Sequence, residues 1–279
     1  MKILVAYDGS IFSDAAIEDM RRAGLPQAAE ALILCVSEAG TAQGSWTSKL
    51  QTADGLAEVA SNRIQSCFPV WKVTAEALWG SPAKTIVETV ARWRPDLAVV
   101  GSHGRSRTAR FVMGSVSLAV VEQAACSVRV ARAGLSAGTA PIRLVIGTDG
   151  SAESEAVIST VTGRSWPKDT EVRVVSVVNV LAPGISELND FDVAERAWLR
   201  SVVDDSVARL RRGGFTVTGT LVDGDPKEDL IREAEDWKAD TIFVAARGLG
   251  RIERLLLGSV SSAVVTRARC SVEVVRKAS

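Results

Sequence analysis

The sequence contains an internal repeat, and this repeat constrains the fold more than any other feature. "KILVAYDGS" at residues 2–10 returns as "RLVIGTDGS" at 143–151, and "GSVSLAVVEQAACSVRVAR" at 114–132 returns as "GSVSSAVVTRARCSVEVVR" at 258–276. Self-similarity on this scale indicates a duplicated structural unit. A chain of 279 residues has room for two domains of ordinary size. We therefore expect two homologous domains.

The boundaries of these domains follow from where the repeat fades. Between the halves lies "AGLSAGTAP", residues 133–141, which is rich in small and turn-forming residues and typical of a linker. We predict domain 1 over residues 1–133 and domain 2 over residues 141–279.

Within each half, apolar runs of strand length alternate with longer segments of helical period. In the first half the predicted strands lie near 2–7, 31–37, 70–78, 96–101 and 127–132, and the predicted helices near 12–24, 54–67, 82–94 and 115–125. In the second half the predicted strands lie near 142–148, 170–178, 216–222, 240–246 and 271–276. Such alternation implies parallel strands joined by right-handed helical crossovers. The predicted fold class is α/β, with helices on both faces of each sheet.

Composition and charge narrow the class of protein. Hydrophobic residues make up 47% of the chain and charged residues 24%, which indicates a soluble globular protein with a buried core. The 33 Lys and Arg residues balance the 33 Asp and Glu residues, so the chain lacks the broad positive field that binding to nucleic acid or anionic membranes needs. The apolar run at the N-terminus ends at Asp8, too early for a signal peptide or a membrane span. We expect a cytoplasmic protein.

Cysteine and histidine offer little material for catalysis or metal binding. The four cysteines, Cys35, Cys67, Cys126 and Cys270, form no C-x-x-C pair and lie in or beside apolar stretches, as reduced buried thiols do. Because His103 is the single histidine, we do not expect a zinc site or a Ser-His-Asp triad. We predict no catalytic residue and no metal ligand.

Two glycine-containing turns follow strands that the predicted topology brings together. In an open parallel sheet, ligands bind beyond the carboxyl ends of the strands, at the point where the strand order reverses. With the strand order 3-2-1-4-5, the turn "YDGS" after the first strand and the turn "GSHG" after the fourth border one crevice. Asp8 and Gly101 would face each other there.

The turn after the fourth strand belongs to a longer motif. Gly101, Gly104, Gly114 and Ser115 form G-x2-G-x9-G-S. Gly114 precedes a predicted helix, and residues 114–117 would present unpaired backbone N–H groups at the helix start, a ready site for phosphate. Glycines in such a segment permit positive φ and let the backbone approach a bulky anion closely.

Each of these features also has a simpler interpretation. Gly-Ser before a helix is often only a turn with an N-cap, and DGS after a strand is most often an Asx turn. Arg107 and Arg110 recur as Arg251 and Arg254, and solvated surface arginines are as good an interpretation as phosphate ligands. The combination of the glycine motif with Asp8, and its recurrence in the second half, favours a ligand site.

At these residues both halves resemble universal stress protein domains, and the chain resembles a tandem universal stress protein. The resemblance implies two tandem Rossmann-like (adenine nucleotide hydrolase-like) domains, each a five-stranded parallel sheet of order 3-2-1-4-5 with an adenine nucleotide at the switch point. In domain 1 it implies nucleotide contacts from Ala6, Asp8, Val36, Gly101, Gly104, Arg105, Gly114, Ser115, Val116 and Ser117. Asp8 would lie by the ribose and adenine, Ala6 and Val36 would line the base, and residues 114–117 would hold the triphosphate. The implied cofactor is ATP, with or without Mg, and AMP and ADP are alternatives.

The second half departs from the motif at one glycine. The implied nucleotide contacts in domain 2 are Thr148, Asp149, Val177, Ala245, Gly248, Gly258, Ser259, Val260 and Ser261. Ala245 replaces the first glycine of the motif, and Arg247 stands where His103 stands. If that glycine needs positive φ, alanine costs about 1–2 kcal/mol, and about 1.4 kcal/mol is tenfold in affinity. We therefore expect a weakened second site.

Three functions remain open. The first is a nucleotide-binding regulatory protein of the stress response, which the motif and the lack of catalytic residues favour. The second is a slow ATPase, although the chain has no Gly-Lys pair and therefore no P-loop lysine. The third is a scaffold that acts through protein contacts without nucleotide. A dinucleotide dehydrogenase fits worse, because G-x-G-x-x-G does not follow the first strand of either half.

The last strand of each half is expected to be a sheet edge. Exposed edges tend to be paired, and the two strands here are "SVRVAR" and "SVEVVR". The resemblance implies that they pair in a two-fold manner within one chain, as an intrachain pseudo-dimer. Dimerisation of whole chains is a further alternative, and the protein partner is unknown.

Overall fold

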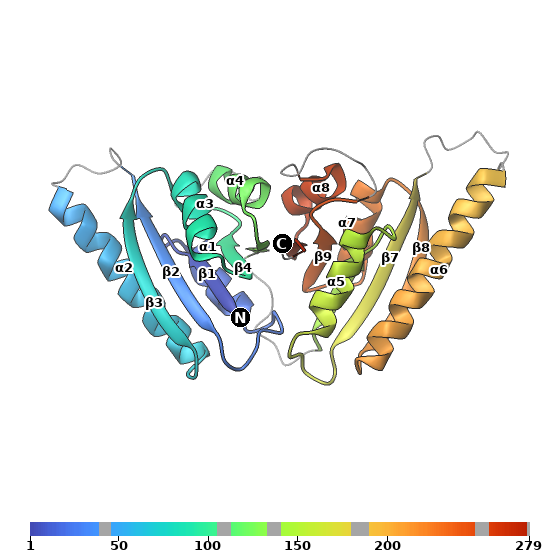
Figure 1. Ribbon diagram of the computed structural model, residues 1–279, viewed down its shortest axis with the longest axis horizontal. Coiled ribbons are helices and arrows are strands. Elements are labelled where there is room, and N and C mark those ends of the chain that lie inside the picture. Colours follow the sequence, from blue (N-terminus) through green and yellow to red (C-terminus); the bar gives the residue numbers. More distant parts are fainter. Residues whose placement is uncertain (39–45, 105–112, 133–140, 180–189, 249–256, 278–279) are drawn as a thin grey trace. The chain divides into compact units, whose positions relative to one another are not determined.

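A computed structural model describes residues 1–38, 46–104, 113–132, 141–179, 190–248 and 257–277 (Figure 1). The chain divides into two compact units, Met1–Ser136 with Lys277–Ser279, and Ala137–Arg276. The predicted linker lies outside the described residues except for Pro141. Within the described residues, no helix combines the length and the hydropathy that a membrane span requires.

The first unit alternates strands and helices as predicted. Its elements are β1 (Lys2–Ala6), α1 (Ile11–Met20), β2 (Glu30–Ser37), α2 (Trp46–Cys67), β3 (Lys72–Trp79), α3 (Pro82–Trp93), β4 (Leu97–Gly101), α4 (Ser115–Gln123) and β5 (Ser127–Ala131). The strands are all parallel and follow the order β3-β2-β1-β4-β5, which confirms the predicted topology. The strand order therefore reverses between β1 and β4.

The second unit repeats this architecture. Its elements are β6 (Arg143–Gly147), α5 (Ala152–Thr162), β7 (Glu171–Asn179), α6 (Asp190–Arg212), β8 (Thr216–Gly224), α7 (Pro226–Asp236), β9 (Thr241–Ala245), α8 (Ser259–Arg267) and β10 (Ser271–Val275). The order β8-β7-β6-β9-β10 is again all parallel. Here the strand order reverses between β6 and β9.

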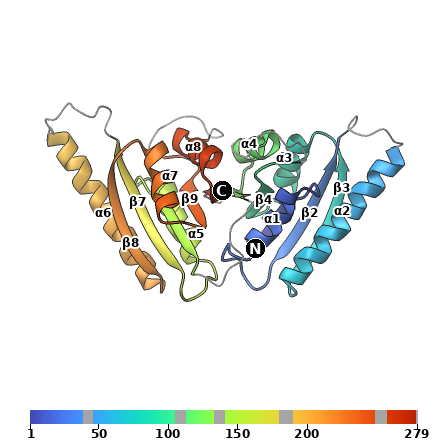
Figure 2. The ribbon, with the colours of Figure 1, turned by 180° about the vertical axis from the view of Figure 1, so that it is seen from behind.

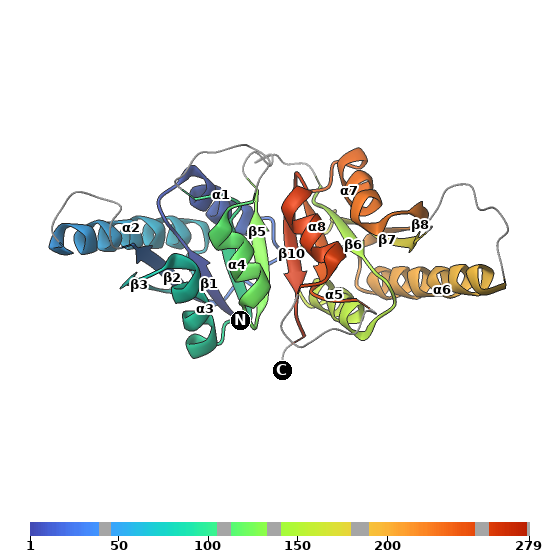
Figure 3. The same ribbon diagram turned by 90° about the horizontal axis from the view of Figure 1, so that it is seen from above.

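Helices cover both faces of each sheet. In the first unit, α1 and α2 contact one another on one face, and α3 and α4 contact one another on the other (Figure 3). The same holds for α5 with α6 and for α7 with α8. Figures 1 and 2 show α2 alongside β2 and β3, and α6 alongside β7 and β8. The central strands β4 and β9 are buried at every position, as their uninterrupted apolar sequences indicate.

Two helix boundaries differ from the prediction. α1 ends at Met20 instead of near residue 24, because residues 21–23 form i→i+3 hydrogen bonds and Gly24 takes a left-handed φ of 61°. α2 begins at Trp46 instead of near residue 54. Its first two turns, "WTSKLQTA", lack the apolar spacing that marked the rest of the helix.

Helices α3 and α7 both start with a proline. Pro82 and Pro226 occupy the first helical turn, where the missing N–H would have no intrahelical partner. Asp225 caps α7 by accepting a hydrogen bond of 2.9 Å from the N–H of Lys227. Ser81 precedes α3 in extended conformation without a side-chain cap. This chain thus accommodates proline at a helix start twice.

The cysteines agree with the expectation of reduced thiols. None of the four forms a disulfide; Cys35, Cys126 and Cys270 are buried, and Cys67 is partly buried. Burial raises the pKa of the Cys67 thiol above its ordinary value.

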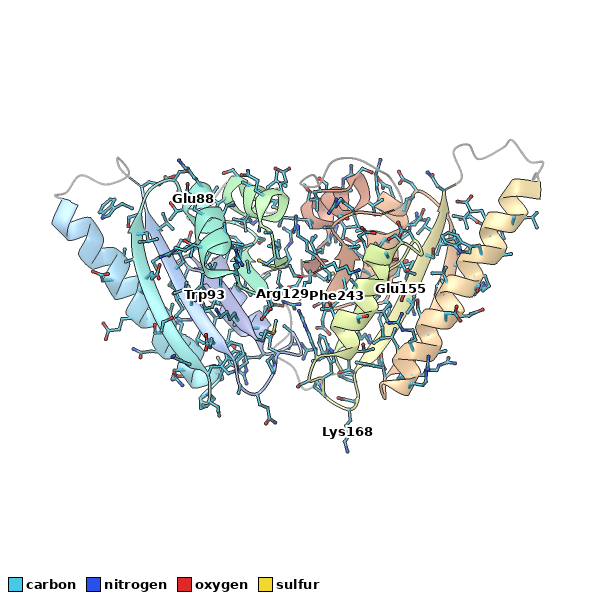
Figure 4. All side chains as sticks on the ribbon, viewed as in Figure 1. Glu88, Trp93, Arg129, Glu155, Lys168 and Phe243 are labelled. Carbon is cyan, nitrogen blue, oxygen red and sulfur yellow. The ribbon has the colours of Figure 1, made fainter. Side chains whose placement is uncertain are left out.

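Each unit contains a buried ion pair between its first helix region and its last strand. In the first unit, Arg129 of β5 donates from Nε to Asp19 Oδ2 at 2.5 Å and from Nη2 to Asp19 Oδ1 at 3.1 Å. The two side chains are 0% and 4% exposed, and Arg129 is labelled in Figure 4. In the second unit, Arg164 Nη1 donates to Glu273 Oε2 of β10 at 2.9 Å. Positions 129 and 273 are equivalent in the repeat, so the two units exchange the charges of the pair.

Asp19→Asn should destabilise the protein, because the buried guanidinium of Arg129 would lose the charge of a carboxylate that it pairs with. Removing one partner of a buried ion pair costs about 3–5 kcal/mol. Urea unfolding of the full chain, followed by circular dichroism, measures this change. Glu18→Gln on the same helix is the control, because Glu18 and Arg21 are 59% and 61% exposed. An exposed pair contributes at most about 1 kcal/mol, so equal effects of the two variants would contradict the assignment.

Candidate functional site

The site is built where β1 and β4 lie side by side. Ile3 and Val5 of β1 pair with Leu97 and Val99 of β4, and the connections after the two strands lead away in opposite directions. Such a reversal leaves a crevice beyond the carboxyl ends of the strands. β6 and β9 repeat this arrangement in the second unit. The predicted turns "YDGS" and "GSHG" therefore meet at one edge of the first sheet.

The turn after the first strand is an Asx turn in both units. Asp8 Oδ1 accepts a hydrogen bond of 3.0 Å from the N–H of Ser10, and Gly9 between them has a φ of 76°. In the second unit Asp149 Oδ1 accepts from both the N–H of Ser151, at 3.0 Å, and its hydroxyl, at 2.6 Å. The simpler interpretation of DGS as an Asx turn is therefore confirmed in both units, where Oδ1 of the aspartate accepts the hydrogen bond of the turn.

The second carboxylate oxygen of each aspartate lies against a glycine of the motif. A Cβ built on Gly104 would lie 3.1 Å from Asp8 Oδ2, and one built on Gly248 would lie 2.2 Å from Asp149 Oδ2. A larger residue at Gly248 would therefore displace the carboxylate, and one at Gly104 would crowd it. The structure brings Asp8 together with Gly104, whereas Gly101, the predicted neighbour of Asp8, lies against Phe12.

The start of α4 is joined to the end of β4 by two hydrogen bonds. The N–H of Gly114 donates to the carbonyl of Ser102 at 2.8 Å, and the hydroxyl of Ser117 donates to the carbonyl of Gly101 at 2.6 Å. In the second unit Gly258 and Ser261 make the same bonds, at 2.8 Å to Ala246 and at 2.6 Å to Ala245.

The first amides of these helices have no acceptor within the helix. The first intrahelical hydrogen bond of α4 runs from the N–H of Leu118 to Gly114 at 3.0 Å, so the N–H groups of residues 115–117 precede it. The prediction of an unpaired N–H at Gly114 is wrong, because that group donates to Ser102. In α8 the equivalent bond runs from Ser262 to Gly258 at 2.9 Å. Because the hydroxyls of Ser117 and Ser261 already donate to strand carbonyls, these serines offer an anion their N–H groups.

The conformational reason given above for the motif glycines is wrong. Gly101 does not have a positive φ, and the N-cap glycines Gly114 and Gly258 have φ values of −63° and −64°. A glycine is needed at 101 because an added Cβ would lie 2.8 Å from the carbonyl oxygen of Phe12 in α1. Ala245 therefore carries no left-handed strain, and the predicted weakening of the second site loses its physical basis.

A cavity of about 670 Å³ opens at the reversal point of the second unit. This volume is in the range of small-molecule sites. Every candidate residue of domain 2 lines it, namely Thr148, Asp149, Val177, Ala245, Gly248, Gly258, Ser259, Val260 and Ser261. The remaining lining residues are Gly147, Ser154, Val175, Pro226, Leu230, Val244, Arg247, Leu257 and Ser262. The cavity thus has an apolar part formed by β7, β9 and α7, and a polar part at the start of α8.

Sequence reasoning missed the contribution of α7 to this cavity. Pro226 and Leu230 stand one helical turn apart, and a Cβ on Gly147 of β6 would lie 2.8 Å from Leu230 Cδ2. The helical spacing of the two residues could have placed them on one face of α7. Nothing local in the sequence indicates which strand that face meets.

In the first unit the candidate residues occupy the corresponding positions. Ala6 ends β1 and is paired with Leu34, and Val36 lies near the end of the adjacent β2. Both are partly exposed at the carboxyl edge of the sheet. Ser115 and Val116 form the first turn of α4. Arg105 and the paired arginines Arg107, Arg110, Arg251 and Arg254 lie outside the described residues.

His103 packs against α1. Its ring centroid lies 4.8 Å from that of Phe12, and its Nδ1 lies 3.1 Å from the hydroxyl of Ser102. Its Nε2 is buried and has no hydrogen-bond partner among the described residues. The equivalent residue of the second unit, Arg247, lines the cavity instead.

Tyr7 directly precedes the first turn, and sequence reasoning did not select it as a site residue. Its hydroxyl donates to Asp14 Oδ1 at 2.6 Å, and Arg63 of α2 lies 3.2 Å from the same carboxylate oxygen. Burial, followed by the hydrogen bond to Asp14, raises the pKa of Tyr7 well above its ordinary value. In the second unit Thr148 takes this place and bonds Ser154 at 3.1 Å.

The family model described as "Universal stress protein family" matches residues 1–132 and 143–276. A universal stress protein of Mycobacterium tuberculosis is 27% identical over 221 residues, which cover 74% of this chain and 69% of that protein. One from Methanocaldococcus jannaschii is 29% identical over 145 residues, 48% of this chain and 82% of that protein. A solved universal stress protein from Archaeoglobus fulgidus superposes with a TM-score of 0.73 over 99% of this chain and 98% of that chain, at 20% identity.

Gly101→Ala should destabilise the first unit by about 1–3 kcal/mol, the usual cost of forcing an extra carbon into packed structure. The added Cβ would meet backbone atoms of Phe12, so α1 would have to shift. Gly55→Ala in α2 is the matched control, because its Cβ would meet nothing within 4 Å. That helical substitution should stabilise the protein by about 0.5–1 kcal/mol. Urea unfolding compares the two, and equal stabilities would show that the approach of Phe12 does not require glycine.

Proposed function

The chain belongs to the universal stress protein family, and on that premise we propose that it binds an adenine nucleotide, ATP above all, at the reversal point of each domain. The observation that carries the proposal is the cavity of the second unit, whose lining includes all nine residues selected from the sequence of domain 2. Binding would change what the protein contacts, which is the action of a regulatory protein rather than of an enzyme.

The polar part of the cavity suits a phosphate chain. The N–H groups at the start of α8 point beyond the helix end, where the helix dipole also favours negative charge. The residues at the helix start are Gly258, Ser259, Val260 and Ser261, which are small enough for a phosphate group to come close to the backbone. The same backbone arrangement at residues 114–117 supports a phosphate site in the first unit.

The apolar part of the cavity suits a base. Val175, Val177 and Leu230 present aliphatic surface beside the end of β6. An adenine ring buried there would gain from the removal of apolar area from water, about 25 cal/mol per Å². Asp149 stands between the two parts and offers carboxylate oxygen to ribose hydroxyls, as acidic residues do in other nucleotide sites.

A slow ATPase is the second candidate. The Nε2 of His103, which is buried and has no hydrogen-bond partner in the described part of the chain, is the observation that favours it, because an imidazole nitrogen can orient a water molecule. Steady-state phosphate release by the wild type, compared with His103→Gln, tests this function. Equal release by the two proteins would exclude a role of His103 in hydrolysis.

Ser115→Pro should weaken ATP binding to the first unit about tenfold or more. The substitution removes one N–H from the start of α4, and a hydrogen bond to a charged group contributes about 1.5–3 kcal/mol. Proline suits this position, because α3 and α7 also start with proline and Gly114 has the extended ψ of 144° that precedes proline. Ser259→Pro is the equivalent change in the second unit. Isothermal titration calorimetry with ATP, on the full chain, measures both.

Ser115→Ala and Ser259→Ala are the controls, because they remove the hydroxyl and keep the N–H. Circular dichroism and the unfolding midpoint establish that each variant folds. Wild-type ATP affinity in the folded double proline variant would overturn the placement of the phosphates. If the purified wild type releases no nucleotide on extraction and takes up none in calorimetry, a scaffold that acts without nucleotide replaces the proposal.

A further inference from the structure

Among the motif residues that the structure describes, the two sites differ in charge at one position. His103 and Arg247 are equivalent in the repeat and both follow the fourth strand of their unit. Arg247 lines the cavity of the second unit and is partly buried. It forms no hydrogen bond or ion pair with the residues that the structure describes. A guanidinium carries its charge at any physiological pH and has five N–H donors to satisfy.

Arg247 stands beside the start of α8. A Cβ built on the N-cap residue Gly258 would lie 3.5 Å from the Cα of Arg247. The N–H groups of residues 259–261 and the backbone of Arg247 therefore lie at the same end of the cavity, within reach of the Arg247 side chain. The other charged residue of the lining, Asp149, already receives two hydrogen bonds from Ser151 on Oδ1. Among the described lining residues, no carboxylate therefore pairs with Arg247, and this end of the cavity keeps a positive potential.

The first unit uses the equivalent position differently. The His103 ring lies against Phe12 and contacts the hydroxyl of Ser102. The residue equivalent to Phe12 in the second unit is Glu153, so Arg247 has no aromatic ring to pack on there. An aromatic contact with α1 in one unit is replaced by a cation facing the cavity in the other.

We infer that Arg247 makes the second site select ligands by the number of their phosphate charges, so that nucleoside di- and triphosphates bind it in preference to monophosphates and nucleosides. This inference rests on the proposed function. Guanidinium pairs with phosphate through two parallel N–H donors, and each added phosphate increases the charge it meets. In the first site, where His103 stands in the equivalent place, this position contributes less to the preference.

The experiment is a series of adenosine, AMP, ADP and ATP, titrated by calorimetry against the full chain. Ser115→Pro reports on the second site and Ser259→Pro on the first. The expected result is a rise in affinity along the series at the second site, and this rise depends on Arg247. Arg247→Gln, placed on the Ser115→Pro background, should lower the ratio of ATP to adenosine affinity about tenfold or more. Arg247→Lys should recover part of this ratio, and His103→Arg should raise it at the first site.

Arg267→Gln is the control for net charge. Arg267 lies at the end of α8, is 55% exposed and pairs with Glu228, so its loss changes the charge of the chain equally but away from the cavity. The inference is overturned if Arg247→Gln and Arg267→Gln shift the ratio by the same factor, or if Arg247→Gln lowers the affinities for ATP and adenosine alike. If the wild-type chain binds none of the four ligands, the proposed function itself fails, which is a different result.

Discussion

Two short hydrogen bonds fasten the fourth helix of each unit to the end of its fourth strand, and the geometry of the site depends on them. An N-cap glycine donates its N–H to the loop after the strand, and a serine hydroxyl donates to the last strand carbonyl. Both acceptors are backbone atoms. The helix amides without an intrahelical acceptor are therefore held at the sheet edge, beside the turn that follows the first strand. No long side chain is needed to place them, which explains why such a site can consist of glycine, serine and valine.

The sequence allowed the fold to be predicted because its main signals are periodic or repeated. The duplication, the alternation of strands and helices, and the order of the five strands all agree with the structure. The requirement for glycine at 101 was explained wrongly, because it arises from a contact with Phe12, which is 89 residues earlier in the chain. Leu230 joins the cavity through a similar contact between distant elements. Such contacts leave no trace in local sequence, and only the coordinates of both partners reveal them.

The buried ion pairs are a second example of contacts that local sequence does not reveal. Asp19 with Arg129, and Arg164 with Glu273, connect corresponding parts of the two units with the charges exchanged. Position 129 is an arginine and position 273 is a glutamate, so the aligned repeat does not reveal that both residues form the buried pair of their unit. A buried ion pair adds little net stability, because removal of both charges from water offsets their attraction. Loss of one partner leaves a buried charge without that partner, which lowers the free energy of unfolding. Each unit is therefore expected to keep both residues or to replace both together. The exchange of charges is what such a constraint permits.

The sites of the two units have diverged in side chains while the backbone has been kept. The Asx turn, the glycine against the aspartate and the helix start recur in both units. Tyr7 and His103 are replaced by Thr148 and Arg247, which changes the size and the charge of the surroundings and leaves the main-chain bonds in place. Because the main-chain hydrogen bonds of the site do not run through these side chains, substitution there changes the surroundings of the crevice and leaves those bonds in place. A duplicated chain with a backbone-made site can therefore acquire two different ligand preferences before it loses either site.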